Sequence, residues 1–419
     1  MFRNRFTYKH TLIACFLSYI TQGIVNNFSP LLFVTFSREL GVSLGEISIL
    51  ITVNFVTQIG VDLVCSLLGD RIDYRKCVLS ASMAAALGLA MLGVLPQSLS
   101  HPFVGLLIAT VFCAIGGGLI EVVVSPMVEA LPGEEKNGAM SLLHSFYCWG
   151  VVGVVLLSTG YFLLFGIENW RFLTFFWALV PLVCGGLFLF VPVLSLNGGA
   201  PGRETKKLLR DKAFLPLIVL MLSAGASEVA ISQWVSLFAE RGLHVSKTLG
   251  DLLGPCAFAV LMGLGRVFFG IFGDRIRMER ALTFSFATCA VSYLIAVFSP
   301  TPIGSLLGCA LCGLSVALLW PGTYRVGAVR IPDGGTRMFA LFALAGDLGC
   351  TFGPDLVGGI SDAVENGKLS AFGNLIAGDP TEVGLKTGIL LLSFFPLAAL
   401  LALWRLRGIG KRKTREKDE

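Results

Sequence analysis

The sequence has 419 residues, of which 55% are hydrophobic and only 14% are charged, and its formal net charge is +5. A soluble domain carries about a quarter charged residues because it needs a hydrated surface. This composition therefore excludes a soluble globular protein and indicates a chain that lies mostly in lipid. The 11 cysteines are scattered, and their spacing predicts no disulfide framework.

Twelve segments of the sequence are long and apolar enough to cross a bilayer. The hydrocarbon core is about 30 Å thick, so a spanning helix needs about 20 mostly apolar residues. In chain order, the segments lie at 10–35, 45–69, 76–96, 102–128, 138–165, 170–194, 213–239, 247–272, 279–299, 302–327, 336–361 and 385–406. The sequence therefore predicts an all-α membrane protein with twelve transmembrane helices.

Lysine and arginine are distributed unevenly between the predicted loops. With the N-terminus in the cytoplasm, 24 of them lie in cytoplasmic segments, six lie in outer segments, and Arg266 and Arg325 fall inside predicted helices. Such a bias sets the orientation of a membrane protein. We therefore expect a multi-pass protein of the plasma (inner) membrane with both termini in the cytoplasm. The positive charge then needs no nucleic-acid partner, and the basic tail can rest on anionic lipid.

A short motif recurs in the two halves of the sequence. The stretch VDLVCSLLGDRIDYRK at 61–76 is similar to GRVFFGIFGDRIRMER at 265–280, and each lies at the end of the second of six predicted spans. The offset of 204 residues (265 − 61) is about half the chain, which indicates an internal repeat. We expect an N-terminal six-helix bundle at 1–195, a basic cytoplasmic linker at 196–212, a C-terminal bundle at 213–406 and a basic tail at 407–419.

The repeated motif resembles the signature of the major facilitator superfamily, G-x-x-x-D-R/K-x-G-x-R/K-R/K. The pairs Asp70-Arg71 and Arg75-Lys76 match it, whereas Ser66 and Asp73 stand where the signature has glycine. The second copy, at 265–280, keeps the acidic and basic positions. The resemblance covers essentially the whole chain and implies a transporter built from two pseudo-symmetric six-helix bundles.

The two motif loops are predicted to form a gate. An aspartate at a helix end beside fixed basic residues can pair across the two bundles in one state and separate in the other. The alternative is a pair of topogenic basic loops with incidental acids. The predicted gating residues are Asp70, Arg71, Arg75, Asp274, Arg275 and Arg280.

Ionisable residues inside the predicted spans are candidates for function, because each is costly in lipid unless it faces a cavity or a partner. They are Asp62, Glu121, His144, Glu228, Arg266, Arg325, Asp347 and Asp355. Glu121 has no basic residue within a helical turn, so it is a candidate proton carrier. The alternative is a packing ion pair with Arg266 or Arg325.

The seventh predicted span carries Glu228, Gln233 and Trp234 near its middle. On a cavity wall, a carboxylate and an amide would bind the hydroxyl groups of a sugar, and an indole would stack on its apolar face. The alternative is that these side chains hydrogen-bond between helices, as polar residues often do in membranes.

Three short stretches resemble the fucose permease family of sugar:proton symporters. They are Glu121 to Ser125-Pro126 with Leu143-His144-Ser145-Phe146, the spacing from Glu228 to Trp234, and Leu318-Leu319-Trp320-Pro321. The resemblance implies that Glu121 serves substrate binding and proton coupling. The chain departs from the fucose transporter in the first span, where Asn26 and Asn27 lie in place of an acidic residue, and at Ser125, where asparagine is common.

Together these features predict a secondary transporter that imports a sugar or a similar small polar solute with protons, acts as a monomer and uses no cofactor or metal. Proton coupling is assigned to Glu121 and Glu228. The predicted substrate-binding residues are Gln22, Asn26, Asn27, His144, Gln233, Trp234, Trp320, Tyr324 and Arg325.

Other functions of the same fold stay open. Arg325 and Arg266 could clamp an organic anion, and an efflux antiporter for drugs or metabolites or a non-transporting membrane sensor are further alternatives. The sequence contains no phosphate-binding loop and no G-x-S-x-G or H-E-x-x-H motif, so neither ATP-driven transport nor an enzyme is expected.

Overall fold

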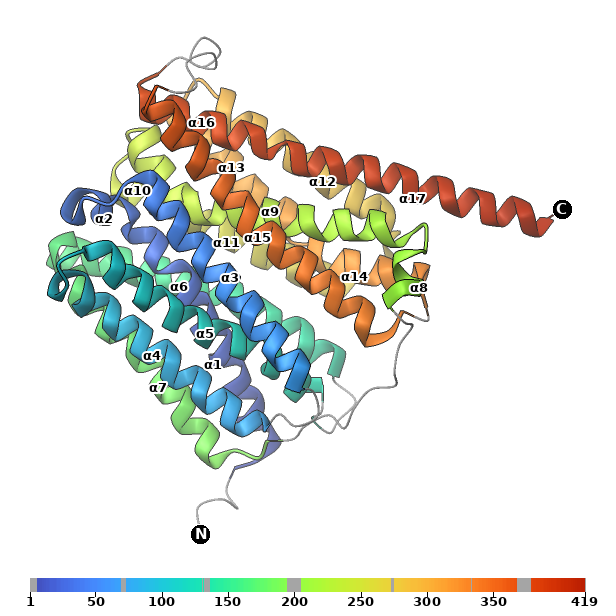
Figure 1. Ribbon diagram of the computed structural model, residues 1–419, viewed down its shortest axis with the longest axis horizontal. Helices are drawn as coiled ribbons and strands as arrows, with labels where there is room; N and C mark the ends of the chain where they lie inside the picture. The colour runs from blue at the N-terminus through green and yellow to red at the C-terminus, as the bar shows by residue number, and fades with distance from the viewer. Residues whose placement is uncertain are drawn as a thin grey trace.

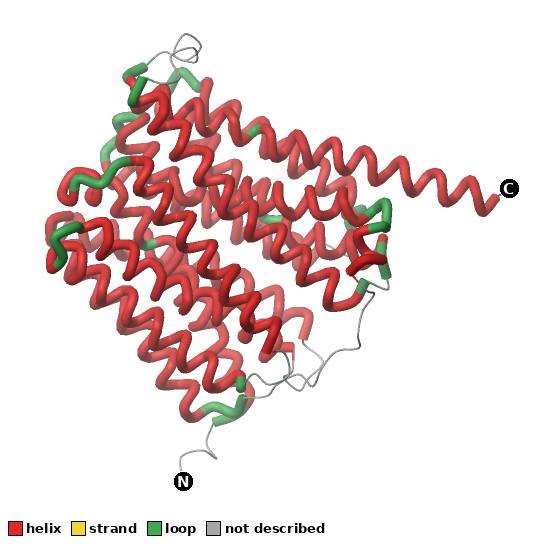
Figure 2. The backbone as a smooth tube through the Cα atoms, in the orientation of Figure 1, coloured by secondary structure: helices red, strands yellow, loops and turns green. Residues whose placement is uncertain are grey.

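The computed structural model describes residues 6–68, 73–129, 131, 136–193, 205–272, 275–332, 334–367 and 378–418. Within these ranges the secondary structure is helical throughout (Figure 2). The first half contains α1 (Tyr8–Asn27), η2 (Ser29–Leu32), α2 (Phe33–Leu40), α3 (Leu44–Leu68), α4 (Tyr74–Ser98), α5 (Pro102–Glu129), α6 (Lys136–Phe165), η4 (Ile167–Asn169) and α7 (Trp170–Phe190). The second half contains α8 (Thr205–Leu209), α9 (Phe214–Leu237), η5 (Phe238–Gly242), α10 (Lys247–Asp251), η6 (Leu252–Cys256), α11 (Ala257–Phe272), α12 (Met278–Phe298), α13 (Pro302–Val316), α14 (Leu319–Arg330), α15 (Gly335–Glu365), α16 (Pro380–Leu392) and α17 (Phe394–Asp418).

Eleven helices in the described part of the chain are long and apolar enough to span a membrane. They coincide with the second to twelfth predicted spans, which confirms the predicted all-α membrane fold. The first predicted span, 10–35, is not among the eleven, because its amides and basic N-terminal residues lower its hydropathy. It forms α1, η2 and the beginning of α2, and α1 packs between α5, α6 and α7.

Prolines interrupt several of these spans. A proline has no N–H and its ring clashes with the carbonyl four residues earlier. Pro321 accordingly lies just after the break between α13 and α14, and Pro396 lies just after the break between α16 and α17. The span from Lys247 to Phe272 likewise combines α10, η6 and α11, and η6 contains Pro255.

The helices form two bundles that lie side by side (Figure 1). Helices α4, α5 and α7 pack together in the first bundle, and α9 packs along α15 in the second. The contact between α9 and α15 depends on glycine, since a Cβ on Gly225 would lie 2.0 Å from the carbonyl oxygen of Gly346. Small residues of this kind allow helix backbones to touch, as expected for the glycine-rich eleventh span.

The two bundles contact each other along α3 and α15 and along α6 and α11. At the end that the basic residues predict to face outward, Asp355 on α15 accepts hydrogen bonds from Ser48 (2.8 Å) and Thr52 (3.3 Å) on α3. Arg241 in η5 donates to Ser37 on α2 at 3.0 Å. We call this the outer end of the molecule, and these contacts hold the bundles together there.

The predicted linker, 196–212, lies only partly within the described residues. Its described part contains α8, which packs against α9 and α15. Helix α17 packs against α9 and α12, and its C-terminal part, which carries the basic tail, extends beyond the bundle (Figure 1).

Candidate functional site

A pocket of about 40 Å³ lies between the two bundles. This volume is well below the roughly 300–1,000 Å³ that is usual for small-molecule sites, so a solute can enter only when the two bundles move apart. Helices α1, α3 and α6 of the first bundle and α9, η6 and α11 of the second supply its walls. The lining residues are Asn27, Phe55, Tyr147, Val151, Glu228, Val229, Ser232, Gln233, Pro255, Phe258 and Met262.

Glu228 supplies the charge in the pocket wall. The residue is only 8% exposed, and its Oε1 accepts a hydrogen bond from Arg266 on α11 at 2.9 Å. Its other oxygen, Oε2, is buried and has no hydrogen-bond partner. Of the two alternatives predicted for Arg266, the structure therefore favours an ion pair, although the partner is Glu228 and not Glu121.

Amide side chains connect the pocket to the first bundle. Asn27 donates to the Tyr147 hydroxyl at 3.0 Å, and Gln233 donates to the backbone oxygen of Asn26 at 3.0 Å. The side-chain oxygen of Asn26 accepts from Gln58 at 3.2 Å. The predicted residues Asn27 and Gln233 thus both line the pocket. Asn26 lies outside the lining and is hydrogen-bonded to Gln58 and Gln233.

Glu121 lies on α5, outside the pocket lining. Gln22 on α1 donates to its Oε2 at 2.8 Å, and the glutamate side chain is exposed although it lies deep within a spanning helix. The carboxyl groups of Asp62 on α3 and Asp347 on α15 contact each other across the two bundles, and both interact electrostatically with Glu121. These three carboxyl groups form an acidic group outside the pocket lining, and Glu121 also interacts electrostatically with Glu228.

Trp234 does not face the pocket, contrary to the predicted placement of its ring on a cavity wall. It is fully buried, and its indole N–H donates to the backbone oxygen of Pro354 at 3.0 Å. Its ring packs against Phe33 with centroids 6.2 Å apart. The reason is geometric: Trp234 follows Gln233 directly, and adjacent residues on a helix point in different directions.

The other predicted substrate residues lie apart from the pocket. Trp320 packs over Gly346, and Tyr324 contacts Phe339 and Phe342. His144 lies with its ring edge-on to Tyr19. Arg325 is exposed on α14.

The predicted gating residues are only partly described, since Asp70, Arg71 and Asp274 lie outside the described residues. Arg75 binds the C-terminal end of α7 in its own bundle, where it donates to the backbone oxygens of Phe188, Leu189 (3.1 Å) and Val191 (2.7 Å). Arg275 and Arg280 are exposed. In this conformation Arg75 thus stabilises a helix end within the first bundle.

Sequence reasoning missed several pocket residues, among them Phe55, Tyr147, Phe258 and Met262. Their apolar or aromatic side chains are indistinguishable from lipid-facing residues in a spanning segment. Of these four residues, only Tyr147 carries a polar group. Its position three residues after His144 is the sequence feature that could have pointed to it.

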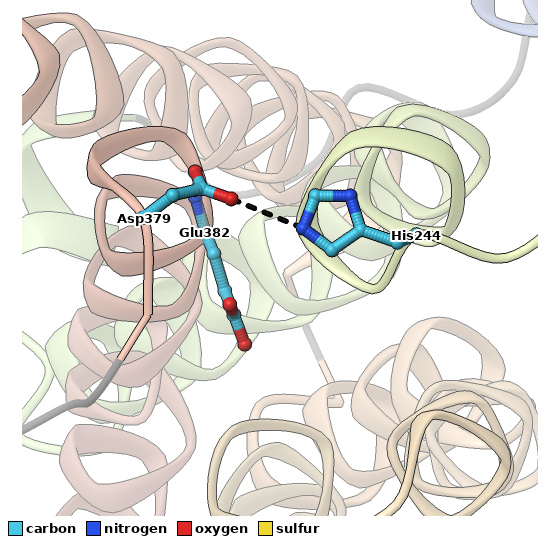
Figure 3. A group of neighbouring side chains, drawn as sticks. All are labelled: His244, Asp379 and Glu382. Atoms are coloured by element: carbon cyan, nitrogen blue, oxygen red, sulfur yellow. Dashed lines mark hydrogen bonds and ion pairs between the residues drawn. The ribbon is translucent and has the colours of Figure 1, made fainter.

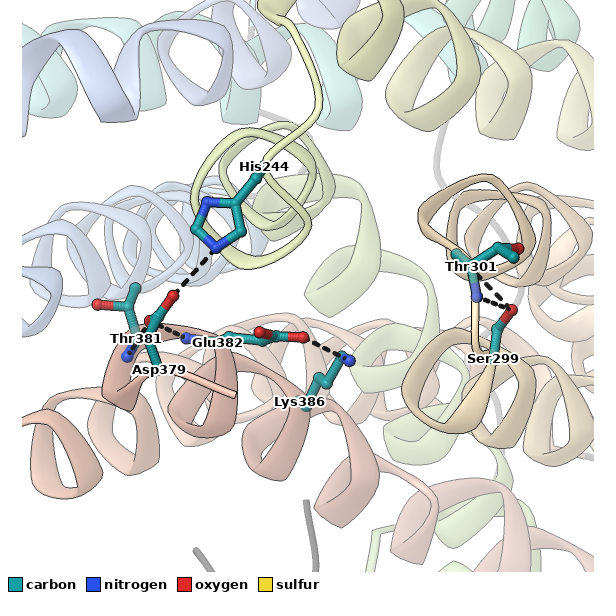
Figure 4. Close-up of polar contacts among 7 residues, drawn as sticks. All are labelled: His244, Ser299, Thr301, Asp379, Thr381, Glu382 and Lys386. Atoms are coloured by element: carbon teal, nitrogen blue, oxygen red, sulfur yellow. Dashed lines mark hydrogen bonds and ion pairs between the residues drawn. The ribbon is translucent and has the colours of Figure 1, made fainter. Parts of the chain in front are cut away.

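A second polar cluster lies at the outer end, outside the pocket. His244, Asp379 and Glu382 have side-chain ligand atoms within 4.8 Å of one another (Figure 3). His244 Nε2 contacts Asp379 Oδ2 at 3.0 Å, while Glu382 pairs with Lys386 at 2.7 Å (Figure 4). The spacing would allow a metal ion, but the lysine already neutralises Glu382. The His244–Asp379 hydrogen bond joins the N-terminus of α16 to the loop before α10.

Asp379 also caps α16. Its Oδ1 accepts from the backbone N–H groups of Thr381 (2.9 Å) and Glu382 (3.0 Å). The hydrogen bond from the Glu382 N–H is the main reason that the pKa of Asp379 is lowered, and His244 and the Thr381 N–H add to it.

Sequence comparisons match most of the chain to a family model and part of it to a curated protein. A sequence model described as Major Facilitator Superfamily matches residues 11–354. Membrane protein MosC of Rhizobium meliloti is 25% identical over 275 residues, which cover 63% of this chain and 64% of that protein. The matched region thus spans a little under two thirds of the length of this curated relative.

Solved transporter structures share the fold. A bacterial homolog of the human lysosomal transporter Spinster, inward-facing and occupied, has a TM-score of 0.75 at 14% identity and covers 96% of this chain and 97% of its own. The nucleoside transporter NupG has a TM-score of 0.71 at 13% identity, with 95% and 98% covered. The E. coli fucose:proton symporter has a TM-score of 0.62 at 14% identity, with 94% and 98% covered.

Proposed function

The chain belongs to the major facilitator superfamily, and we propose that it is a proton-coupled secondary transporter that imports a sugar or a related small polar solute by alternating access. The pocket between the bundles carries this proposal. Because both bundles line it, rocking one bundle against the other would open it to one side of the membrane at a time.

The outer contacts support the alternating-access part of the proposal. Asp355 with Ser48, and Arg241 with Ser37, join the bundles at the outer end. These bonds would break when the pocket opens outward. The motif loops, with Asp70, Arg71 and Asp274, are proposed to make the corresponding contacts at the cytoplasmic end, with Arg75, Arg275 and Arg280 beside them.

Glu121 is the proposed proton carrier. It is exposed within the membrane span and is bound by the neutral amide of Gln22, so taking up a proton changes the net charge of its surroundings. Contacting carboxyl groups resist simultaneous ionisation, which makes the nearby Asp62 and Asp347 pair a second candidate for the same role.

The solutes named for two of the structurally similar transporters support a polar solute for this chain. Solved relatives with this fold include a fucose:proton symporter and a nucleoside transporter, and amides, hydroxyls and aromatic rings line the pocket of this chain. An organic anion is less well supported, because Arg266 is engaged by Glu228.

Proteoliposome transport tests the proposal. With an inward proton gradient, wild-type protein is expected to accumulate a labelled sugar. Glu121→Gln removes the titratable group and should lose gradient-driven accumulation, while counterflow without a gradient stays within about twofold of wild type. The exposed Glu168→Gln in η4 is the matched control and should behave like wild type. Equal gradient-driven accumulation by Glu121→Gln would exclude Glu121 as the carrier.

A further inference from the structure

We propose that the Glu228–Arg266 pair makes the pocket selective for neutral solutes with hydroxyl groups, with the free Glu228 Oε2 accepting a hydrogen bond from the solute and Arg266 acting as a positioning residue. This inference rests on the proposed transport function and names the substrate class of that site. It also separates Glu228 from Glu121, so that one carboxyl group binds the solute and the other carries the proton.

The unpartnered oxygen is the first argument. Glu228 is more than nine-tenths buried, and only Oε1 is bonded. A buried acceptor without a donor is costly, and hydrogen bonds to charged groups are among the stronger ones. A solute hydroxyl in the pocket would supply the missing donor.

The charge of the pocket is the second argument. Among the described residues that line the pocket, Glu228 is the only carboxylate and none is a Lys, Arg or His, and Arg266 pairs with Glu228 at 2.9 Å. A carboxylate solute would place its oxygens against the free Oε2 with no cation left to receive them. An ammonium solute would bring a charge that no second carboxylate in the lining balances. A neutral donor meets neither obstacle.

The apolar walls are the third argument. Phe55 from the first bundle, and Phe258 and Met262 from the second, face the same space as the polar groups. Sugars and related ring compounds have one apolar face and a hydroxyl-bearing rim, which suits a pocket of this mixed character.

Arg266 orients the carboxylate from behind. Its guanidinium lies in α11 next to Cys148 and Tyr147 of α6, so it is held where the two bundles meet. Because it binds only Oε1, the lone pairs of Oε2 stay unbonded; Oε2 is enclosed by protein in this conformation, so a solute would reach it when the pocket opens. Arg266→Lys keeps the charge but loses the planar, forked donor geometry, so it should preserve folding while it weakens solute binding.

The experiment measures binding to purified full-length protein in detergent by calorimetry. The probes are one matched set of glucose, glucuronate and glucosamine, together with four further neutral compounds: fucose, ribose, sorbitol and uridine. At least one neutral probe is expected to bind, and within the glucose set the acid and the amine should bind at least about tenfold more weakly, the effect of one charge-assisted hydrogen bond.

Variants separate recognition from folding. Glu228→Gln is expected to weaken the binding of the best neutral probe about tenfold to a hundredfold. Arg266→Lys is expected to weaken this binding less. If Arg266→Met alone fails to fold because Glu228 is left unpaired, the double variant Glu228→Gln with Arg266→Met removes both charges. This double variant should fold, and it should bind the neutral probe as weakly as Glu228→Gln alone. The control is Glu382→Gln with Lys386→Met, which removes another largely buried ion pair, at the outer end, and should bind like wild type.

Three outcomes would overturn the inference: tighter binding of glucuronate or glucosamine than of glucose, unchanged affinity in Glu228→Gln, or no binding of any neutral probe. Counterflow in liposomes tests the proposed function separately. Binding that depends on Glu228 without any counterflow would uphold the inference about selectivity and contradict the transport function.

Discussion

At the scale of single residues, Glu121 and Glu228 show that the same type of side chain lies in two different electrostatic settings. A guanidinium binds Glu228 and keeps its site neutral, whereas an amide binds Glu121 and adds no charge. Protonation therefore has different consequences at the two sites: at Glu121 it removes a net charge, and at Glu228 it would leave Arg266 without its counter-ion, which is expensive in a buried setting.

Trp234 provides a second test at this scale. Its N–H bond to Pro354 and its full burial predict a packing role. Trp234→Phe should lower the stability of the protein by about 1 kcal/mol, the value of one hydrogen bond, with the KM for the solute changed less than twofold. Thermal unfolding in detergent and counterflow kinetics measure the two effects. Trp404→Phe, at a side chain 76% exposed, is the control. A raised KM with unchanged stability would contradict the packing role and indicate that Trp234 contacts the solute.

The sequence identifies the polar residues of the site better than their partners. Glu121 and Glu228 are recognisable because an acid in an apolar segment needs an explanation. Their partners are 99 and 38 residues away in the chain, and no local pattern encodes such contacts. The sequence equally does not determine which face of a helix meets the pocket, because apolar residues lie on all sides of a membrane helix. Gln233 lines the pocket, whereas the adjacent Trp234 does not.

At the scale of elements, the spanning helices follow from hydropathy, and their breaks follow from proline. The first span is less apolar than the others because α1 carries Gln22, Asn26 and Asn27, whose side chains hydrogen-bond to other helices. The same amides that lower its hydropathy connect α1 to the pocket through Asn27 and to Glu121 through Gln22.

The N-terminus of α16 yields a prediction on pH. The pKa of Asp379 is lowered in the folded state, so the unfolded chain binds more protons and the contribution of this residue to stability is lost as the pH falls through the acidic range. Asp379→Ala removes the cap and should cost about 1 kcal/mol at neutral pH. The difference in thermal stability from wild type should shrink between about pH 5 and pH 3. Glu168→Ala, at an acidic residue that does not cap a helix, is the control. A difference in thermal stability between Asp379→Ala and wild type that does not change with pH, or an equal effect in Glu168→Ala, would contradict the capping role.

At the scale of the whole molecule, the two bundles are related by repetition but joined by few polar contacts. The repeat and the twelve segments predicted this division from the sequence. The conformation was beyond prediction, because both open and closed arrangements use the same helices and differ only in which ends touch. In this structure the described contacts at the outer end include Asp355 with Ser48 and Arg241 with Ser37.

Two adjacent glycines on α15 allow the outer closure to be tested. A Cβ on Gly358 would lie 2.5 Å from the Cβ of Ser48 on the opposite bundle and 2.7 Å from the Trp234 ring, whereas a Cβ on Gly359 would meet nothing within 4 Å. Gly358→Ala should therefore push the bundles apart at the outer end, and Gly359→Ala should not. Spin labels at the exposed positions Arg38 and Leu249 would report the separation by electron paramagnetic resonance. A longer distance in Gly358→Ala alone supports α3–α15 contact as the outer closure, and the same distance in both variants would contradict it, because packed interfaces respond to a single methyl group.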